Sequence, residues 1–207
     1  MKLYRFLKGM LLGLIKFLFG IKGVGRENEP KDGAYIICSN HISFADVILI
    51  GAVIKRPVRF LAKAELFKIP VLGAFFKAMG AFPIKRGTAD VGAIKTSIKL
   101  LSENEIVAVF IQGTRCPGKE LADTETKSGA AMMAYRAGVP VLPIYIEAKG
   151  NRLKLFRRNT VHVGRLITTE EMAFETGSKS EYDRVTKMIF DRIIDMSEEA
   201  KSEREVK

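Results

Sequence analysis

The sequence has few of the residues from which disulfide frameworks and metal sites are built. Its 207 residues include only two cysteines, Cys38 and Cys116, and two histidines. Two widely separated cysteines give neither a disulfide framework nor a metal-ligand spacing, so we expect free thiols and no bound metal. A repeat of about 20 to 50 residues is also missing, which excludes solenoids and propellers. A hydrophobic content of 47% then indicates an ordinary globular chain.

The N-terminal segment has no long apolar run. Its longest uncharged run, from Gly9 to Ile15, is seven residues, whereas a helix that spans a bilayer needs about 20 apolar residues. Residues 1–26 nevertheless carry six basic residues, many leucines and phenylalanines, and no acidic residue. A basic, aromatic-bearing helix of this kind suits the surface plane of an anionic membrane. We therefore predict a membrane-interfacial amphipathic helix over residues 1–26.

Other partners for this basic chain also have to be weighed. The net charge is +11, and residues 149–165 form a second basic block, so anionic partners are favoured. No recognised nucleic-acid-binding motif accompanies the charge, and we expect no nucleic acid partner. The N-terminal helix has two alternatives, packing on the protein's own core or a secretory signal. A secretory signal would be followed by a small-residue cleavage site, and the sequence has none after this segment.

Residues 27–207 alternate short β-type runs with longer amphipathic stretches. This order predicts a single α/β domain with a mostly parallel sheet flanked by helices. Pro70 should kink one of the helices. The expected strands are 34–38, 58–62, 81–84, 106–111 and 141–146, and the expected helices are 43–54, 64–79, 90–102, 128–137 and 180–201.

The motif NHISFAD, residues 40–46, follows the first of these strands. Ser43 and Asp46 have the spacing of a helix-start capping box, which puts His41 at the carboxyl end of a buried strand, where α/β sheets bind ligands. Asp46 would accept a hydrogen bond from one imidazole nitrogen and leave the other basic, as a general base requires. The alternative is a helix-start acid beside a surface histidine.

Further polar residues follow other strands in the same way. Because parallel strands end at the same end of a sheet, we expect these residues near His41, although each cation taken alone is more often a solvated surface charge. Lys127 precedes a helix start, where free backbone amides favour an anion. The candidates are Gln112, Gly113, Thr114 and Arg115 after strand 106–111, Arg86 after strand 81–84, and Lys127.

Four blocks in this order resemble the glycerolipid acyltransferase family, and most closely the 1-acylglycerol-3-phosphate acyltransferases. NHISFAD is similar to the family's N-H-x-S-x-x-D block, and GAFPIKR (80–86) to its second block. FIQGTR (110–115) resembles F-P-E-G-T-R, and VPVLPI (139–144) resembles the fourth block. The order and spacing agree across about residues 35–146.

The resemblance implies transfer of an acyl chain from coenzyme A or acyl carrier protein to lysophosphatidic acid, giving phosphatidic acid. It implies that His41 is the base, that Asp46 orients it, and that Arg86, Arg115 and Lys127 bind the acceptor's phosphate. No metal or redox cofactor is implied. The enzyme is expected to act at the cytoplasmic face of a membrane as a peripheral or monotopic protein.

One departure from the family pattern leaves alternatives open. Ile111 and Gln112 stand where the family usually has proline and glutamate, and glutamine keeps a hydrogen-bonding carbonyl but loses the charge. Beside lysophosphatidic acid, the alternatives for the acceptor are glycerol 3-phosphate or another lysophospholipid, and a further alternative is a non-catalytic relative that binds anionic membranes. A thiol hydrolase that uses Cys116 with His41 is a further alternative.

Overall fold

The computed structural model describes residues 13, 14, 16–78, 80–84 and 90–205. The strands are β1 (Ile21–Val24), β2 (Tyr35–Ser39), β3 (Val58–Lys63), β4 (Phe82–Ile84), β5 (Ile106–Phe110), β6 (Val141–Glu147) and β7 (Asn159–Val163). The α-helices are α2 (Asp46–Val53), α3 (Pro70–Ala78), α4 (Val91–Ser102), α5 (Gly129–Ala137), α6 (Thr169–Met172) and α7 (Lys179–Glu205). Short 3-10 helices are η1 (Arg26–Asn28), η2 (Ala64–Lys68), η3 (Leu121–Asp123) and η4 (Lys149–Asn151).

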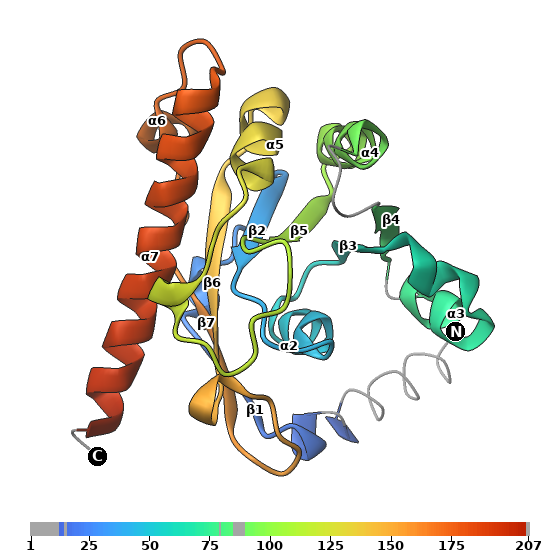
Figure 1. The fold of residues 1–207 in the computed structure, drawn as a ribbon, viewed down its shortest axis with the longest axis vertical. Coiled ribbons are helices and arrows are strands. Elements are labelled where there is room, and N and C mark those ends of the chain that lie inside the picture. The colour runs from blue at the N-terminus through green and yellow to red at the C-terminus, as the bar shows by residue number, and fades with distance from the viewer. Residues whose placement is uncertain (1–12, 15, 79, 85–89, 206–207) are drawn as a thin grey trace.

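The seven strands form one sheet in the order β1-β7-β6-β2-β5-β3-β4 (Figure 1). Every neighbouring pair is parallel except β6 and β7, which are antiparallel. The predicted α/β domain with a mostly parallel sheet is therefore confirmed. β2 lies between β5 and β6. Its carboxyl end is therefore flanked by the carboxyl ends of two parallel neighbours, and such sheets bind ligands at the carboxyl ends of their strands.

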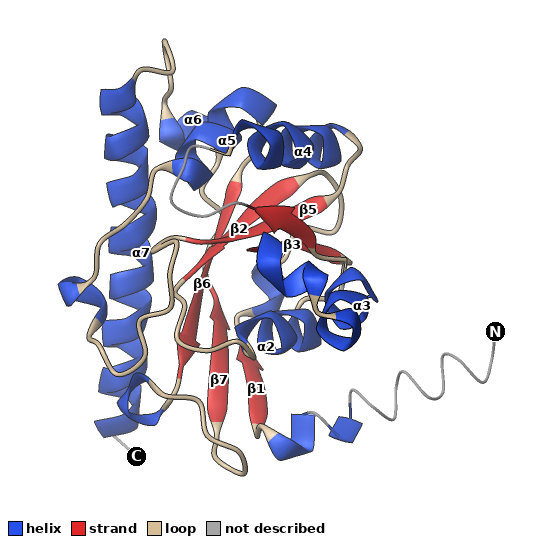
Figure 2. Cartoon of the chain, turned by 45° about the vertical axis from the view of Figure 1, so that its right-hand side comes forward, coloured by secondary structure: helices blue, strands red, loops and turns tan. Residues whose placement is uncertain are grey.

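The two faces of the sheet are covered by different helices (Figure 2). Ile36 and Cys38 of β2 pack in a core with side chains of α4, α5 and α7. The alternate residues Tyr35 and Ile37 pack in a second core with α2. A strand that buries both faces reads as a continuous apolar run, which is why YIIC was recognisable in the sequence.

The N-terminal prediction needs one correction. Residues 1–12 and 15 lie outside the described part, so a membrane-interfacial helix there stays a prediction, and residues 13, 14 and 16–18 are helical. The segment does not remain helical to residue 26, because Ile21–Val24 form β1 and pair with β7. Gly20 ends the helix at φ +52°, and a Cβ atom there would lie 2.5 Å from the carbonyl oxygen of Arg157.

Two prolines occupy positions that tolerate a missing N–H. Pro70 is the first residue of α3 and separates that helix from η2, which divides the predicted helix over 64–79. The first turn of a helix tolerates proline because its N–H would have no partner there. Pro83 lies in β4, at the edge of the sheet, where a missing N–H is also tolerated.

A polar cluster joins β6, β7 and α7. The carboxylate of Glu147 contacts His162 Nε2 at 2.8 Å and Arg204 Nε at 2.9 Å. The hydrogen bond with His162 lowers the pKa of the Glu147 carboxyl. His162 therefore has a structural setting in β7, in keeping with its position in the sequence among strand residues.

We expect Glu147→Gln to lower the free energy of unfolding by about 1–3 kcal/mol at neutral pH, the usual cost of losing charged hydrogen bonds. A depressed carboxyl pKa stabilises the fold above the unfolded-state value of about 4.3, and this stabilisation is lost as pH falls through the folded-state value. Denaturant titrations from pH 7 downward should show the two proteins converging. The exposed Glu175→Gln serves as a control, and a difference that persists at low pH would contradict this assignment.

Candidate active site

The site is organised around one buried carboxylate oxygen. Asp46 is fully buried, and its Oδ2 lies 2.7 Å from His41 Nδ1. The same oxygen accepts hydrogen bonds from the backbone amides of Ile42 at 2.8 Å and Ser43 at 2.9 Å. Helix α2 begins at Asp46, after Ala45, rather than near Ser43. The predicted capping box is therefore wrong in its helix start, although the reach of Asp46 back to Ser43 is present.

This contact sets the tautomer of the histidine. A carboxylate only accepts hydrogen bonds, so Nδ1 carries the proton and the basic lone pair of neutral His41 is on Nε2. His41 is 4% exposed, and its ring stacks on Phe110 of β5 with the centroids 3.8 Å apart and the planes 8° apart. The imidazole is thus fixed in both its plane and its rotation.

Gln112 holds the backbone of the histidine. It is 3% exposed, and its Oε1 accepts a hydrogen bond from the backbone N–H of His41 at 2.8 Å. Its Nε2 donates to Thr124 Oγ1 at 3.2 Å. Through these contacts Gln112 joins the end of β5 to the His41 turn and positions the histidine. The substrate-binding role that the sequence predicted for Gln112 stays a prediction.

Two further contacts fix the same turn. The side chain of Asn40 donates to the carbonyl of Ile146 at 3.0 Å and accepts from its N–H at 2.7 Å. The carbonyl of His41 accepts from the N–H of Cys116 at 2.7 Å. Sequence reasoning did not foresee these roles for Asn40, the first residue of the motif, or for Phe110, the last residue of β5.

Two of the predicted phosphate-binding residues, Arg115 and Lys127, lie in the segment that follows β5. Arg115 is exposed and stacks over the ring of Phe44, a residue of the motif, at 3.5 Å. Lys127 is exposed and passes over Gly113, where an added Cβ would lie 3.1 Å from its Cγ. Thr114, between them in sequence, is also exposed. The predicted Arg86 lies outside the described residues.

The arrangement is suited to acid–base chemistry on a polar substrate. A buried imidazole oriented by a carboxylate can take a proton from a hydroxyl, and nearby cations suit an anionic group. Burial raises the pKa of the Cys38 thiol to about 12, which makes that cysteine a poor nucleophile. Within the described ranges, no three His, Cys, Asp or Glu residues are grouped as a metal site.

Comparison with known proteins places this geometry in a family. A family model described as acyltransferase matches residues 20–147, more than half of the chain. The chain belongs to the acyltransferase family. The matched region contains the His41–Asp46 pair, Gln112, Arg115 and Lys127, so the site described above lies within the family domain.

Individual relatives agree with this membership. The 1-acyl-sn-glycerol-3-phosphate acyltransferase of Bacillus subtilis (strain 168) is 32% identical over 157 residues, covering 75% of this chain and 77% of that protein. The Escherichia coli (strain K12) protein of the same name is 28% identical, covering 77% of this chain and 65% of that protein. The crystal structure of the 1-acyl-sn-glycerophosphate (LPA) acyltransferase PlsC from Thermotoga maritima matches 87% of this chain and 72% of its own, with a TM-score of 0.70 and 27% identity.

Asp46→Asn should separate the charge of Asp46 from its hydrogen bonds. The asparagine oxygen can take the place of Oδ2 and accept from Nδ1 and from the amides of Ile42 and Ser43, but the neutral amide no longer stabilises the imidazolium that forms when His41 takes a proton. We expect kcat to fall by about 10²- to 10⁴-fold, with a thermal midpoint within a few degrees of wild type. The exposed Asp123→Asn is the matched control. A kcat close to wild type in Asp46→Asn would contradict a role for the charge of Asp46.

Gln112→Ala and Gln112→Glu should differ in their effects. Alanine removes the acceptor of the His41 N–H, and we expect a loss of about 1–3 kcal/mol in unfolding free energy together with a lower kcat. Glutamate retains an acceptor for that N–H, and the Thr124 hydroxyl can rotate to donate to it, so its kcat should stay within about tenfold of wild type. An inactive glutamate variant with wild-type stability would show that the amide has another function.

Proposed function

We propose that this protein transfers a fatty acyl chain from an acyl thioester to the free hydroxyl of lysophosphatidic acid, giving phosphatidic acid. The observation that carries the proposal is the buried His41–Asp46 pair, with Nδ1 and Oδ2 2.7 Å apart, in a chain that belongs to the acyltransferase family. Relatives named 1-acyl-sn-glycerol-3-phosphate acyltransferase support this acceptor.

The reaction needs one base and no covalent enzyme intermediate. His41 Nε2 removes the proton from the acceptor hydroxyl, and the resulting alkoxide attacks the thioester carbonyl carbon. The tetrahedral intermediate then collapses, the carbon–sulfur bond breaks, and the leaving thiolate takes the proton from the imidazolium. The Asp46 carboxylate stabilises the positive charge on the ring between these two transfers.

The exposed cations beside the turn suit the acceptor's phosphate. The guanidinium of Arg115 lies over the ring of Phe44, and a planar guanidinium can donate two hydrogen bonds to phosphate oxygens. Lys127 adds a point charge next to Gly113. Together with Arg86 we assign these residues to phosphate binding. Gly113 and Thr114 form the turn that carries Arg115 past the histidine.

The donor and the setting follow from the chemistry of the substrates. We propose coenzyme A or acyl carrier protein as the thiol carrier, without a metal or redox cofactor, because the transfer is an acid–base reaction. The acceptor and the product are lipids, so we place the enzyme at the cytoplasmic face of an anionic membrane, where both carriers are found. Among the described helices, none combines the length and apolar character needed to cross a membrane.

The test is an acyl-transfer assay in detergent with lysophosphatidic acid and either acyl-coenzyme A or acyl carrier protein. Wild type should form phosphatidic acid, and His41→Ala should reduce kcat by about 10²- to 10⁴-fold, the usual contribution of a general base. His162→Gln, which changes the other histidine, should keep its activity. Absence of phosphatidic acid with either donor would reject the proposed reaction, and an active His41→Ala would reject the base.

A further inference from the structure

The loop between β6 and β7, residues 148–158, exposes apolar and basic side chains together. It carries five basic residues and no acidic one. At its tip, Leu155 is 53% exposed and Phe156 is 69% exposed. Phe156 also has φ +57°, a left-handed conformation that large side chains rarely adopt. A strained backbone that presents an aromatic ring to solvent points to a use for that ring outside the protein.

The N-terminal segment joins this tip and enlarges it. Phe17 is 73% exposed, and its ring meets Phe156 edge-on with the centroids 6.5 Å apart. The backbone N–H of Phe156 donates to the carbonyl of Leu18 at 2.6 Å, and that of Asn159 donates to Gly20 at 3.2 Å. Phe17, Leu155 and Phe156, here called the apolar tip, therefore belong to one fixed surface.

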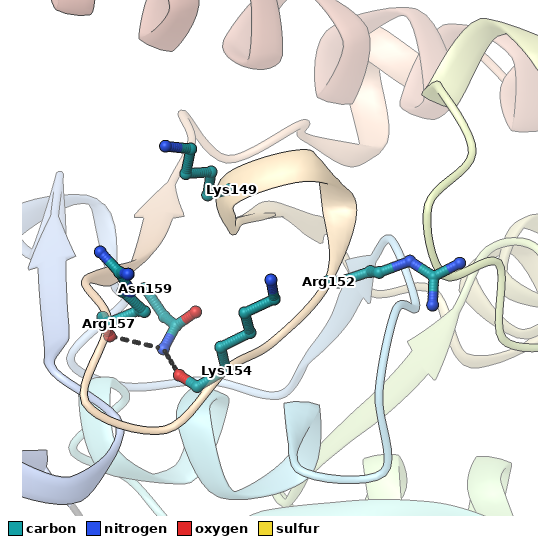
Figure 3. A pocket seen from close by; sticks show the side chains of 5 residues that line it. All are labelled: Lys149, Arg152, Lys154, Arg157 and Asn159. Carbon is teal, nitrogen blue, oxygen red and sulfur yellow. Dashed lines mark hydrogen bonds between the residues drawn. The ribbon is translucent and has the colours of Figure 1, made fainter.

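Cations surround a pocket beside the apolar tip. The pocket is lined by Lys149, Arg152, Lys154 and Arg157, here called the cation ring, and by Asn159. Figure 3 shows Lys149, Lys154 and Arg157 gathered around it, while Arg152 extends away from them. None of the four cations forms an ion pair with a described residue.

The shape of the cation ring is set by the buried side chain of Asn159. Asn159 is 1% exposed, and its Nδ2 donates to the carbonyls of Arg157 at 3.0 Å and Lys154 at 3.3 Å. These bonds hold the loop closed, so unpaired positive charges are kept near one another. Since like charges repel, this arrangement favours an anionic ligand in the pocket.

The loop follows the carboxyl end of β6, at the same end of the sheet as the catalytic pair. The Asn40 side chain, next to His41, is bonded to the backbone of Ile146, two residues before the loop begins. The N–H of Gly118, in the segment after Gln112, donates to the carbonyl of Asn151 in the loop at 2.9 Å. The loop and residues 13, 14 and 16–20 lie at one end of the molecule, opposite α4 and α5 (Figure 1).

We propose that the β6–β7 loop is a bilayer-docking site. Phe17, Leu155 and Phe156 enter the apolar boundary of an anionic membrane, and Lys149, Lys154 and Arg157 bind the phosphates of lipid headgroups. Charge alone would equally suit an acidic protein or a nucleic acid, but exposed phenylalanines among the cations are characteristic of an interfacial segment. The docking proposal rests on the proposed function, in which His41 acts on a lipid acceptor that the docked protein would take from the bilayer.

Vesicle co-sedimentation of the full chain tests this site. The tip variant is Leu155→Ser with Phe156→Asn, since asparagine accepts the left-handed backbone, and the ring variant is Lys154→Gln with Arg157→Gln. The matched controls are at the opposite end of the molecule, the exposed Val91→Ser on α4 for the tip, and Lys95→Gln on α4 with Arg136→Gln on α5 for the ring. Thermal midpoints establish that all variants are folded.

The tip variant should bind vesicles containing phosphatidylglycerol about 10- to 100-fold more weakly than wild type, from the loss of two inserted side chains. The ring variant, which removes two cations, should lose about 30-fold on the same vesicles and be unchanged on pure phosphatidylcholine. The controls should bind like wild type. Wild-type affinity in the tip variant, or an equal loss in the controls, would overturn the proposal.

Two further measurements identify other occupants and protect the conclusion. The first is binding of inorganic phosphate to the cation ring. If phosphate saturates the cation ring and the ring variant still binds vesicles like wild type, the pocket is a site for a soluble phosphate and the docking proposal is overturned. Acyl transfer to a short-chain, water-soluble lysophosphatidic acid should be equal in wild type and the tip variant, and transfer to the vesicle-embedded acceptor should fall in the variant. If no form transfers acyl chains, the proposed function fails, whereas vesicle affinity still decides the docking site.

Discussion

A buried carboxylate must find hydrogen-bond donors, and Asp46 finds three of them on a single oxygen. The imidazole of His41 and the amides of Ile42 and Ser43 all converge on Oδ2. The turn from β2 to α2 brings these donors to one atom, and their hydrogen bonds offset part of the cost of burying the carboxylate. The conformation of the turn and the tautomer of the base have the same cause.

The rest of the site keeps that turn in place from both sides. Gln112 bonds the amide of His41 from the end of β5, and Asn40 bonds the backbone of β6. Since β2 lies between these two strands, the histidine is fixed to each neighbour by one amide side chain. Catalytic geometry held in advance needs little reorganisation during the reaction.

The sequence predicted what periodicity and strand ends determine. Apolar runs such as YIIC and IVAVF located β2 and β5, and the polar residues after them located the edge of the site. It did not predict where the side chain of Gln112 points, because spacing cannot distinguish an amide facing substrate from one facing the backbone. Nor did it predict β1, which is only four residues long and becomes a strand by pairing with β7, about 140 residues away in the chain.

The position of Pro83 affects how separate molecules meet. β4 is an edge strand of three residues, and its central residue has no N–H. A short edge strand that contains proline offers few donors to a strand from a second molecule, and natural sheets use both features to disfavour edge-to-edge pairing. The proline within β4 should therefore help to keep a concentrated preparation of this acyltransferase from associating through that edge.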